Sequence, residues 1–299
     1  MTTEKLFCLE TLGEDVTEIL EKAHCTIAFA GSYVVKFFNK GFDKYDEVAI
    51  AHEYEWDKKM SSSPPLLFRD VKYMGMSIFV LVLTKFPKES NLMFKMLHHE
   101  ADDNILYSVC KHINEISDSY EAIQITPDDM LNYYIQNISL QIARIGDKIP
   151  DHLNHSIRNF MENTANLNLF KKAISDKKAV CVHGNMFSSN IYYYKAKTTI
   201  LDPLSYNHFA RKSCRIADLA TFFADIRIFQ PLSKYLRIFK RMSISFDEND
   251  LAIFQLYIIL KILVRYRFAL MEYRKGDNYI SISNHIVIKR STTILEMLI

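Results

Sequence analysis

The residue pattern of the chain changes near position 85, and this change restricts the folds that the chain can adopt. Before that point, β-rich runs bounded by Gly, Ser and Pro predict two hairpins. Their strands are expected at 25–29, 33–38, 66–73 and 77–83. After it, apolar residues recur mostly at helical spacing. The pattern predicts an α+β fold with a small β-rich domain at 1–88 and a large, mainly helical domain at 89–299.

Most of the other predicted secondary-structure elements are helices. In the first domain, helices are expected at 14–23 and at about 45–60. In the second domain, they are expected at about 91–98, 102–117, 127–147, 152–175, 214–228, 232–242, 247–274 and 283–297. A three-strand element at 179–202 interrupts these helices, and it holds the most distinctive residues of the chain.

Composition and charge argue against several classes of protein. The chain has 299 residues and is 49% hydrophobic, which suits a folded protein with a large core and not a disordered one. Its 37 basic and 35 acidic residues nearly cancel, so charge gives no support for binding to nucleic acid or to a membrane surface. Five scattered cysteines lack metal-ligand spacing. The apolar stretch from Leu251 to Val264 is too short and too charged to cross a membrane, and no signal peptide is evident, so a cytoplasmic protein is expected.

The three-strand element carries polar residues in a layout that kinases use. The apolar strand around Val180 runs into His183 and Gly184, and Asn190 opens the next strand. A third strand ends at Asp202, so Asn190 and Asp202 bracket a predicted hairpin. One amide oxygen and one carboxylate suit a Mg²⁺ ion that also binds nucleotide phosphates. The alternative is that both residues only form turns.

Lys36 is the matching candidate in the first domain. It lies in the middle of a strand among large apolar residues, where an unpaired ammonium group is costly. Glu53, on the following helix, would relieve that cost, and kinases use such a pair to hold the α- and β-phosphates. The alternative is that Lys36 points into solvent from an edge hairpin.

Three further features of the second domain have both a structural and a functional interpretation. His183 either only packs or hydrogen-bonds the loop backbone and fixes its shape. Asp218 begins an apolar helix, where the helix dipole favours an acid and where a buried carboxylate can also bond the loop backbone. The basic residues Arg211, Lys212 and Arg215 either form a solvated face or meet a phosphate or an acidic acceptor.

Other enzyme classes lack their motifs in this sequence. With only seven glycines, the chain contains neither GxxxxGK[ST] nor GxGxxG, so a P-loop enzyme or a Rossmann dehydrogenase is not expected. No HExxH is present, and Ser188 and Ser189 have no nucleophile-elbow context.

Taken together, these motifs resemble those of the aminoglycoside phosphotransferase-like superfamily, in which His-Gly-Asp-x-x-x-x-Asn precedes a strand that ends in Asp. Within it, the chain most resembles a bacterial branch of largely uncharacterised predicted small-molecule kinases. Besides the loop, the matching segments are 24–36, 52–59, 80–89 and 218–220. The resemblance covers about 24–94 and 179–225, and the middle and C-terminal helices have no match.

The resemblance implies a bilobal protein-kinase-like fold, with ATP and Mg²⁺ as cofactors. It makes Lys36 and Glu53 the phosphate-holding pair, and Asn190 and Asp202 the Mg²⁺ ligands. His183 and Asp218 belong to the catalytic loop and its support. Further nucleotide contacts are implied at Thr26 and, around the segment that would receive adenine by backbone bonds, at Leu83, Thr84 and Phe86.

One position departs from the family pattern, because the catalytic Asp falls on Asn185. An amide cannot accept a proton as a carboxylate does, and general-base help is worth typically ~10²–10⁴-fold. Slow turnover with retained nucleotide binding is therefore expected. Three explanations are open: the natural protein has Asp and this chain carries a deliberate change, the chain is a pseudokinase, or another residue has taken over the base role. The otherwise complete set of residues favours the first.

The sequence leaves the phosphate acceptor open. The resemblance favours a hydroxyl of a small molecule, bound between the loop 183–190 and helices of the second domain. A protein-directed kinase or toxin is the alternative, with the basic residues 211–215 docking a partner; no nucleic-acid or membrane partner is expected. Asp247, Glu248 and Asp250 would suit a cationic acceptor, but their place at a predicted helix start favours capping.

Overall fold

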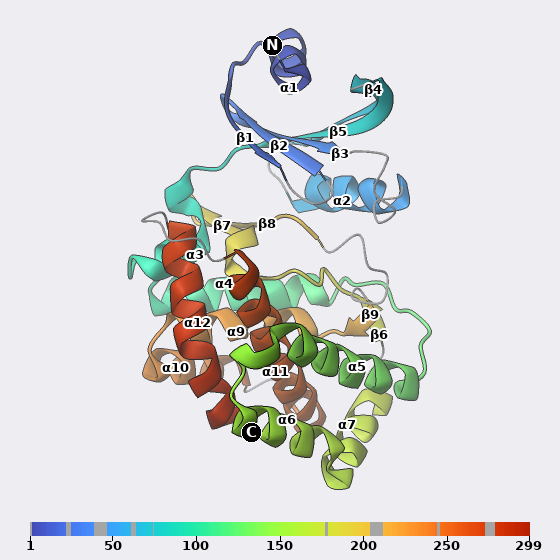
Figure 1. Cartoon of the computed structure of the whole chain (residues 1–299), viewed down its shortest axis with the longest axis vertical. Coiled ribbons are helices and arrows are strands. Elements are labelled where there is room, and N and C mark those ends of the chain that lie inside the picture. Colours follow the sequence, from blue (N-terminus) through green and yellow to red (C-terminus); the bar gives the residue numbers. More distant parts are fainter. Residues whose placement is uncertain are drawn as a thin grey trace. The chain divides into compact units, whose positions relative to one another are not determined.

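The computed structural model describes residues 2–21, 25–38, 47–60, 64–73, 75–176, 179–203, 212–243, 246–272 and 279–299. The chain divides into two compact units (Figure 1). Unit 1 comprises Met1–Asn91 and Asn190–His208, and unit 2 comprises Leu92–Ser189 and Phe209–Ile299. The chain thus returns to unit 1 for a single segment, which the sequence had assigned to the second domain.

Unit 1 is built on a five-stranded antiparallel sheet with strand order β1-β2-β3-β5-β4. Its strands are β1 (Val16–Glu21), β2 (Cys25–Ala30), β3 (Tyr33–Phe38), β4 (Leu66–Tyr73) and β5 (Met76–Thr84). Both predicted hairpins, β2 with β3 and β4 with β5, are present. Gly75 has a φ of +80° between β4 and β5, a conformation that glycine adopts without steric cost.

The two faces of this sheet bury different helices, because side chains alternate along each strand. One face, which includes Val35 and Phe37, packs against the N-terminal helix α1 (Thr3–Phe7) and the π-helix η1 (Cys8–Leu12). The other face, which includes Phe38, packs against α2 (Glu47–Met60). Figure 1 shows α1 and α2 on opposite sides of the sheet.

A separate hairpin completes unit 1. It consists of β7 (Ile191–Tyr194) and β8 (Lys197–Ile200), as the sequence predicts. The indole Nε1 of Trp56, on α2, donates a hydrogen bond to the carbonyl oxygen of Ile200 at 3.1 Å. The ring of Phe86 stacks on that of Tyr192 with centroids 5.0 Å apart, just before the short helix η2 (Lys88–Ser90). These contacts join the hairpin to α2 and to the segment that follows β5.

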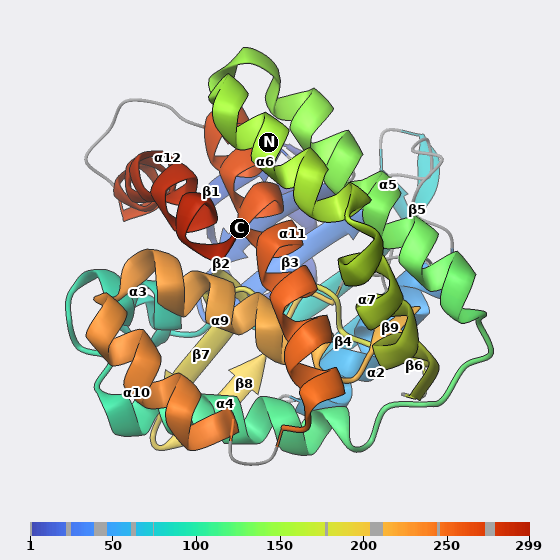
Figure 2. The same cartoon turned by 90° about the horizontal axis from the view of Figure 1, so that it is seen from below.

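Unit 2 is a helical bundle around α11 (Glu248–Glu272), a helix of 25 residues. Four helices pack against α11 (Figure 2): α5 (Pro127–Ile145), α7 (Thr164–Asp176), α9 (Ala217–Phe229) and α12 (Tyr279–Leu298). The other elements are α3 (Leu92–Leu97), α4 (Asp103–Ser117), η3 (Gly146–Lys148), α6 (Asp151–Glu162), η4 (Ser188–Asn190, which continues into unit 1), α10 (Leu232–Ser243), and the paired strands β6 (Ala179–Cys181) and β9 (Lys212–Cys214). Every residue of α9 is buried, including its two acids. No helix within the described ranges has an apolar stretch long enough to cross a membrane.

Three predictions of secondary structure are wrong. The helix expected at 14–23 is the edge strand β1, because β-branched residues there pair with β2, and this tertiary contact overrides the local amphipathic pattern. The helix expected at 152–175 is two helices, α6 and α7, which meet at Asn163. Residues 212–214 pair with β6 as β9, so the helix expected from 214 begins only at Ala217.

Asn163 gives the break between α6 and α7 a physical cause. Its Oδ1 accepts hydrogen bonds from the backbone N–H groups of Ala165 at 3.0 Å and Asn166 at 3.2 Å. A side-chain acceptor at this position caps a helix start, because the first backbone N–H groups of a helix have no partner within it.

We expect Asn163→Ala to destabilise the protein by about 1 kcal/mol, because the substitution removes the capping oxygen. Thermal unfolding should show a midpoint roughly 2–4 °C below that of the parent chain. Asn163→Ser keeps an acceptor and should unfold close to the parent. Equal midpoints for the Ala and Ser variants would contradict the capping role.

Candidate active site

Lys36 lies at the centre of a charged cluster in unit 1. Its partners across the sheet are Ile27 and Leu81, which places it on the face that packs against α2. Its Nζ donates hydrogen bonds to Glu53 Oε1 at 2.5 Å and to Asp202 Oδ1 at 2.6 Å. The Lys36 side chain is 10% exposed, that of Glu53 is fully buried and that of Asp202 is 47% exposed. A strand, a helix and a hairpin end thus bring these charges together, which excludes the alternative of a solvated lysine.

Asp57 belongs to the same cluster, although no sequence motif singled it out. It follows Glu53 by one turn of α2, and this spacing puts both acids on one face of the helix. Burial raises the pKa of Asp57 well above its ordinary value, and the neighbouring Glu53 carboxylate raises it further, against the opposing effect of Lys36. The i, i+4 spacing of two acids on a helix opposite a strand lysine was the signal that could have revealed it.

The neighbouring carboxylates keep Lys36 charged, whereas burial makes it costly to ionise Glu53 and Asp57. Burial lowers the pKa of Lys36, but the carboxylates of Asp202, Glu53 and Asp57 raise it more, so the net shift is upward. Burial also raises the pKa of Glu53, against the lowering effect of Lys36. One ammonium group therefore faces three carboxylates, and negative charge is in excess when all of them are ionised.

This excess of negative charge fits a divalent cation beside Asp202. Asp202 follows β8 and Asn190 precedes β7, and the backbone N–H of Leu201 donates to the Asn190 carbonyl oxygen at 3.0 Å. Both predicted Mg²⁺ ligands therefore lie at the base of the hairpin, where Leu201 and not Asp202 is directly opposite Asn190. Within the described ranges, no group of three or more His, Cys, Asp or Glu is arranged to hold a metal ion by itself. Phosphate oxygens and water would have to complete the coordination, as Mg²⁺ prefers.

The other residues predicted to contact nucleotide are less closely associated with Lys36. Thr26 is buried, but the register of β2 puts it on the sheet face opposite to Lys36. Leu83 is buried on the α2 face, and Thr84 is half-buried at the end of β5. The next backbone N–H, that of Lys85, already donates to the Ser32 carbonyl oxygen at 2.7 Å.

In unit 2, Asp218 fixes the beginning of the loop that follows β6. Its Oδ2 accepts the backbone N–H of His183 at 2.8 Å, and its Oδ1 accepts that of Gly184 at 2.9 Å. The hydroxyl of Tyr120 also donates to Asp218 Oδ2, at 2.6 Å. The His183 ring Nδ1 accepts the backbone N–H of Asn185 at 3.2 Å. The loop-shaping contacts expected of His183 and Asp218 are therefore both present, and the backbone at Asn185 is held by them.

A second acid of α9 fixes the end of the same loop. Asp225 lies two turns after Asp218, and its Oδ2 accepts the backbone N–H of Ser188 at 2.7 Å and the Ser188 hydroxyl at 2.6 Å. Its Oδ1 accepts Nε of Arg265, on α11, at 3.1 Å. Sequence motifs did not reveal Asp225 or Arg265; the signal was two acids seven residues apart in an otherwise apolar helix.

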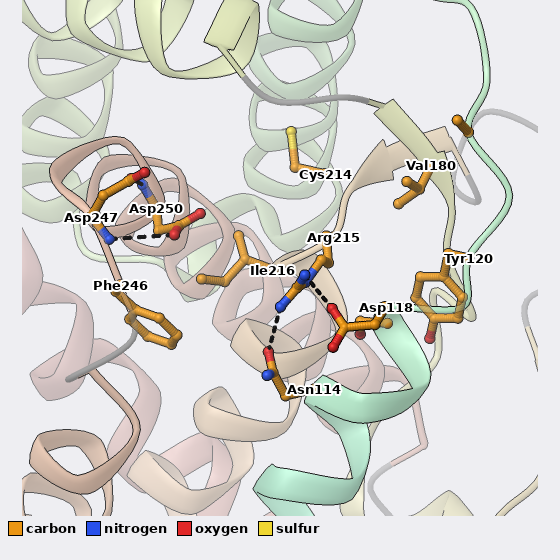
Figure 3. Close-up of a pocket in the computed structure, with 12 residues that line it drawn as sticks. Asn114, Asp118, Tyr120, Val180, Cys214, Arg215, Ile216, Phe246, Asp247 and Asp250 are labelled. Atoms are coloured by element: carbon orange, nitrogen blue, oxygen red, sulfur yellow. Dashed lines mark hydrogen bonds and ion pairs between the residues drawn. The ribbon is translucent and has the colours of Figure 1, made fainter.

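Unit 2 also contains a pocket of about 530 Å³, and Tyr120 is among the residues that line it (Figure 3). Arg215 pairs there with Asp118 and donates to the side chain of Asn114. Asp247 Oδ1 accepts the backbone N–H of Asp250 at 2.7 Å, so the predicted capping role of this acidic cluster is confirmed. None of the described loop residues 183–190 lines the pocket.

The predicted basic cluster can be followed only in part. Arg215 takes part in an ion pair, whereas Arg211 lies outside the described residues, as does the side chain of Lys212. The docking role of this cluster stays a prediction.

No family model matches the sequence, and no curated protein is matched by it. Several solved structures of similar fold are phosphotransferases. The GDP complex of aminoglycoside 2′-phosphotransferase-IIIa is 10% identical, with a TM-score of 0.56 over 97% of this chain and 98% of that chain. A glucosamine kinase in complex with glucosamine, ADP and inorganic phosphate is 10% identical, with a TM-score of 0.52 over 93% of this chain and 75% of that chain. The choline kinase LicA from Streptococcus pneumoniae is 15% identical, with a TM-score of 0.51 over 97% and 99% of the two chains.

At these identities the likeness concerns the fold. It confirms the predicted bilobal kinase-like fold. The roles assigned to individual residues stay predictions.

Asp57 gives the Lys36 cluster a testable pH dependence. Because its pKa is raised in the folded protein, the native state binds a proton more tightly than the unfolded chain does, and stability falls as the pH rises between the two pKa values. Asp57→Asn cannot ionise, so we expect it to raise the unfolding midpoint at pH 8 by roughly 2–4 °C, and by less at pH 5.

Glu55→Gln is the matched control, because Glu55 is an exposed acid on the same helix. Its unfolding midpoint should stay near that of the parent at both pH values. An Asp57→Asn variant that gains nothing at pH 8 would show that the buried carboxylate carries no electrostatic cost.

Proposed function

We propose that this chain is an ATP- and Mg²⁺-dependent phosphotransferase that acts on a hydroxyl group of a small molecule, and that Asn185 limits its turnover. The observation that carries the proposal is the ion-pair cluster of Lys36 with Glu53 and Asp202. A purely structural buried lysine needs a single carboxylate. Here a strand lysine is held by a helix glutamate and also meets the hairpin acid that would bind a metal, the combination that positions nucleotide phosphates.

Within unit 1, each charged residue has a distinct task in this proposal. Glu53 orients the Lys36 ammonium group, which holds the α- and β-phosphates. Asn190 and Asp202 supply an amide and a carboxylate oxygen to Mg²⁺, which neutralises phosphate charge when it is bound. The excess of carboxylates around Lys36 favours the arrival of that cation.

Within unit 2, the acids of α9 hold the loop that carries residue 185. Asp218 and Asp225 bond the backbone at both ends of the loop, so the position of Asn185 is fixed before any substrate arrives. The Asn185 amide oxygen can accept a hydrogen bond from an acceptor hydroxyl, which orients that hydroxyl. It cannot take up the proton, so the step that depends on proton removal is slow.

The similar solved structures support the proposal at the level of chemistry. Their names include an aminoglycoside phosphotransferase, a glucosamine kinase and a choline kinase, and complexes with GDP and ADP are among them. The acceptors in these names are small molecules with a hydroxyl group. The nucleotides in these complexes are of the kind that Lys36 and Asp202 would bind.

A second candidate is a nucleotide-binding regulator without catalysis. Asn185 favours it, because the amide removes the general base while Lys36, Glu53 and the predicted metal ligands remain. The two candidates share nucleotide binding and differ in turnover, so separate measurements distinguish them.

The first measurement is thermal unfolding with ATP or GTP, each with and without MgCl₂. Ligand that binds only the folded state raises the midpoint, so we expect a rise of several degrees with a nucleoside triphosphate and Mg²⁺. Lys36→Met should weaken that binding at least tenfold, because the phosphates lose their cation, and circular dichroism should verify its fold. Lys197→Met is the control, because Lys197 is an exposed lysine of the same unit. The absence of any shift for the parent chain at saturating nucleotide would overturn both candidates.

The second measurement is the turnover of ATP by Asn185→Asp. A carboxylate restores the proton acceptor, so we expect a rise of at least tenfold and on the order of 10²-fold or more. Asn185→Ala should show no rise. A variant that binds Mg²⁺ and ATP normally and gains less than tenfold would leave the non-catalytic regulator as the better candidate. Radiolabelled ATP added to cell lysate would then show whether the label enters small molecules or protein.

A further inference from the structure

Lys261 is a partly buried charged residue that none of the roles above uses. It lies in the middle of α11, where Leu260, Ile262 and Leu263 are buried. Its Nζ donates a hydrogen bond to the carbonyl oxygen of Gly184 at 3.0 Å. Burial of an ammonium group is costly, so its place in this helix needs a compensating interaction.

The Asp218 carboxylate, whose charge acts on Lys261, is already hydrogen-bonded to other groups. Burial lowers the pKa of Lys261, and the Asp218 carboxylate on α9 raises it by less. Both oxygens of Asp218 accept hydrogen bonds from the loop backbone, and one of them also accepts the Tyr120 hydroxyl. Within the described ranges, no Asp or Glu forms an ion pair with Lys261. The ammonium group therefore has a carbonyl oxygen as its direct partner and lacks a carboxylate of its own.

The carbonyl that Lys261 holds is part of the peptide bond between Gly184 and Asn185. A cation bound there is close to whatever side chain residue 185 carries. A carboxylate at that position could be a direct counter-ion for Lys261, which an amide cannot be. Opposite charges that come close in a partly buried site interact strongly.

We propose that Lys261 is the counter-charge of position 185. Its ammonium group fixes the peptide that carries residue 185, and its charge is coupled to the side chain there. With Asp at 185, Lys261 stabilises the ionised carboxylate, the form that orients an acceptor hydroxyl. With Asn at 185, the same charge is available to an anionic group at the loop, such as the phosphoryl group in transfer. Lys261 is thus a positioning residue. The catalytic part of this inference rests on the proposed function, whereas the electrostatic coupling between Lys261 and position 185 does not.

A double-mutant cycle tests the coupling without a substrate. The parent chain, Asn185→Asp, Lys261→Met and the double variant are compared by thermal unfolding at pH 7. We expect Asn185→Asp to be more favourable in the parent chain than in the Lys261→Met background, with a difference of about 3 °C or more between its two effects on the midpoint. An equal effect of Asn185→Asp in both backgrounds overturns the proposal.

Further variants separate charge from packing. Lys261→Arg keeps the charge, so Asn185→Asp should be nearly as favourable in this background as in the parent chain. Lys261→Gln is a second neutral variant, on which the cycle is repeated if Lys261→Met does not fold. Lys289→Met removes an exposed lysine of α12, and it should leave the effect of Asn185→Asp unchanged. An effect of Asn185→Asp that Lys289→Met diminishes as much as the neutral variants at position 261 do contradicts a role for the Lys261 charge.

The catalytic part has its own readout in the Asn185→Asp background. There we expect Lys261→Met to lower kcat about tenfold or more and to leave KM for ATP within about twofold, because Lys261 holds the loop and none of the predicted nucleotide contacts. An unchanged kcat overturns this part. If the chain binds no nucleotide at all, the proposed function fails, and the unfolding cycle still decides whether Lys261 and position 185 are coupled.

Discussion

The cost of burying a charge governs the two functional parts of this protein. In unit 1, Lys36 can occupy the middle of an apolar strand only because Glu53 and Asp202 reach its ammonium group. These three residues come from a strand, a helix and a hairpin that the chain reaches more than a hundred residues later. The ion-pair cluster therefore holds the hairpin, and with it the predicted metal ligands, in a defined place in unit 1.

The same constraint applies in unit 2, where the buried charged groups are carboxylates and not an ammonium group. The helix α9 is buried along its whole length, so its two carboxylates must find donors inside the protein. They find them in the backbone of the loop 183–188, and basic residues of α11 complete the network. A segment that carries little regular secondary structure is thereby fixed by charge-assisted hydrogen bonds, which are stronger than neutral ones.

Asn185 is the position at which the chain departs from the residue pattern of the proposed phosphotransferase. The contacts that shape its loop are in place, and so is the lysine that holds the neighbouring peptide. These groups position residue 185 whether it is an amide or a carboxylate. The difference between the two lies in proton transfer and in the charge next to Lys261, which is why turnover and electrostatic coupling are the informative quantities.

The sequence by itself predicted the fold class, both hairpins of the main sheet, most of the helices, and the pairing of Lys36 with Glu53. These features depend on local periodicity or on a lone charge in an apolar run, and both are visible in the order of residues. It did not predict β1, whose strand state depends on pairing with β2, or the roles of Asp57, Asp225 and Lys261. Each of these three is an ordinary charged residue on a helix until the fold brings its partner to it. Only the tertiary structure decided which groups surround these three charges, because the free energy of a buried charge depends on neighbours that lie far away in the sequence.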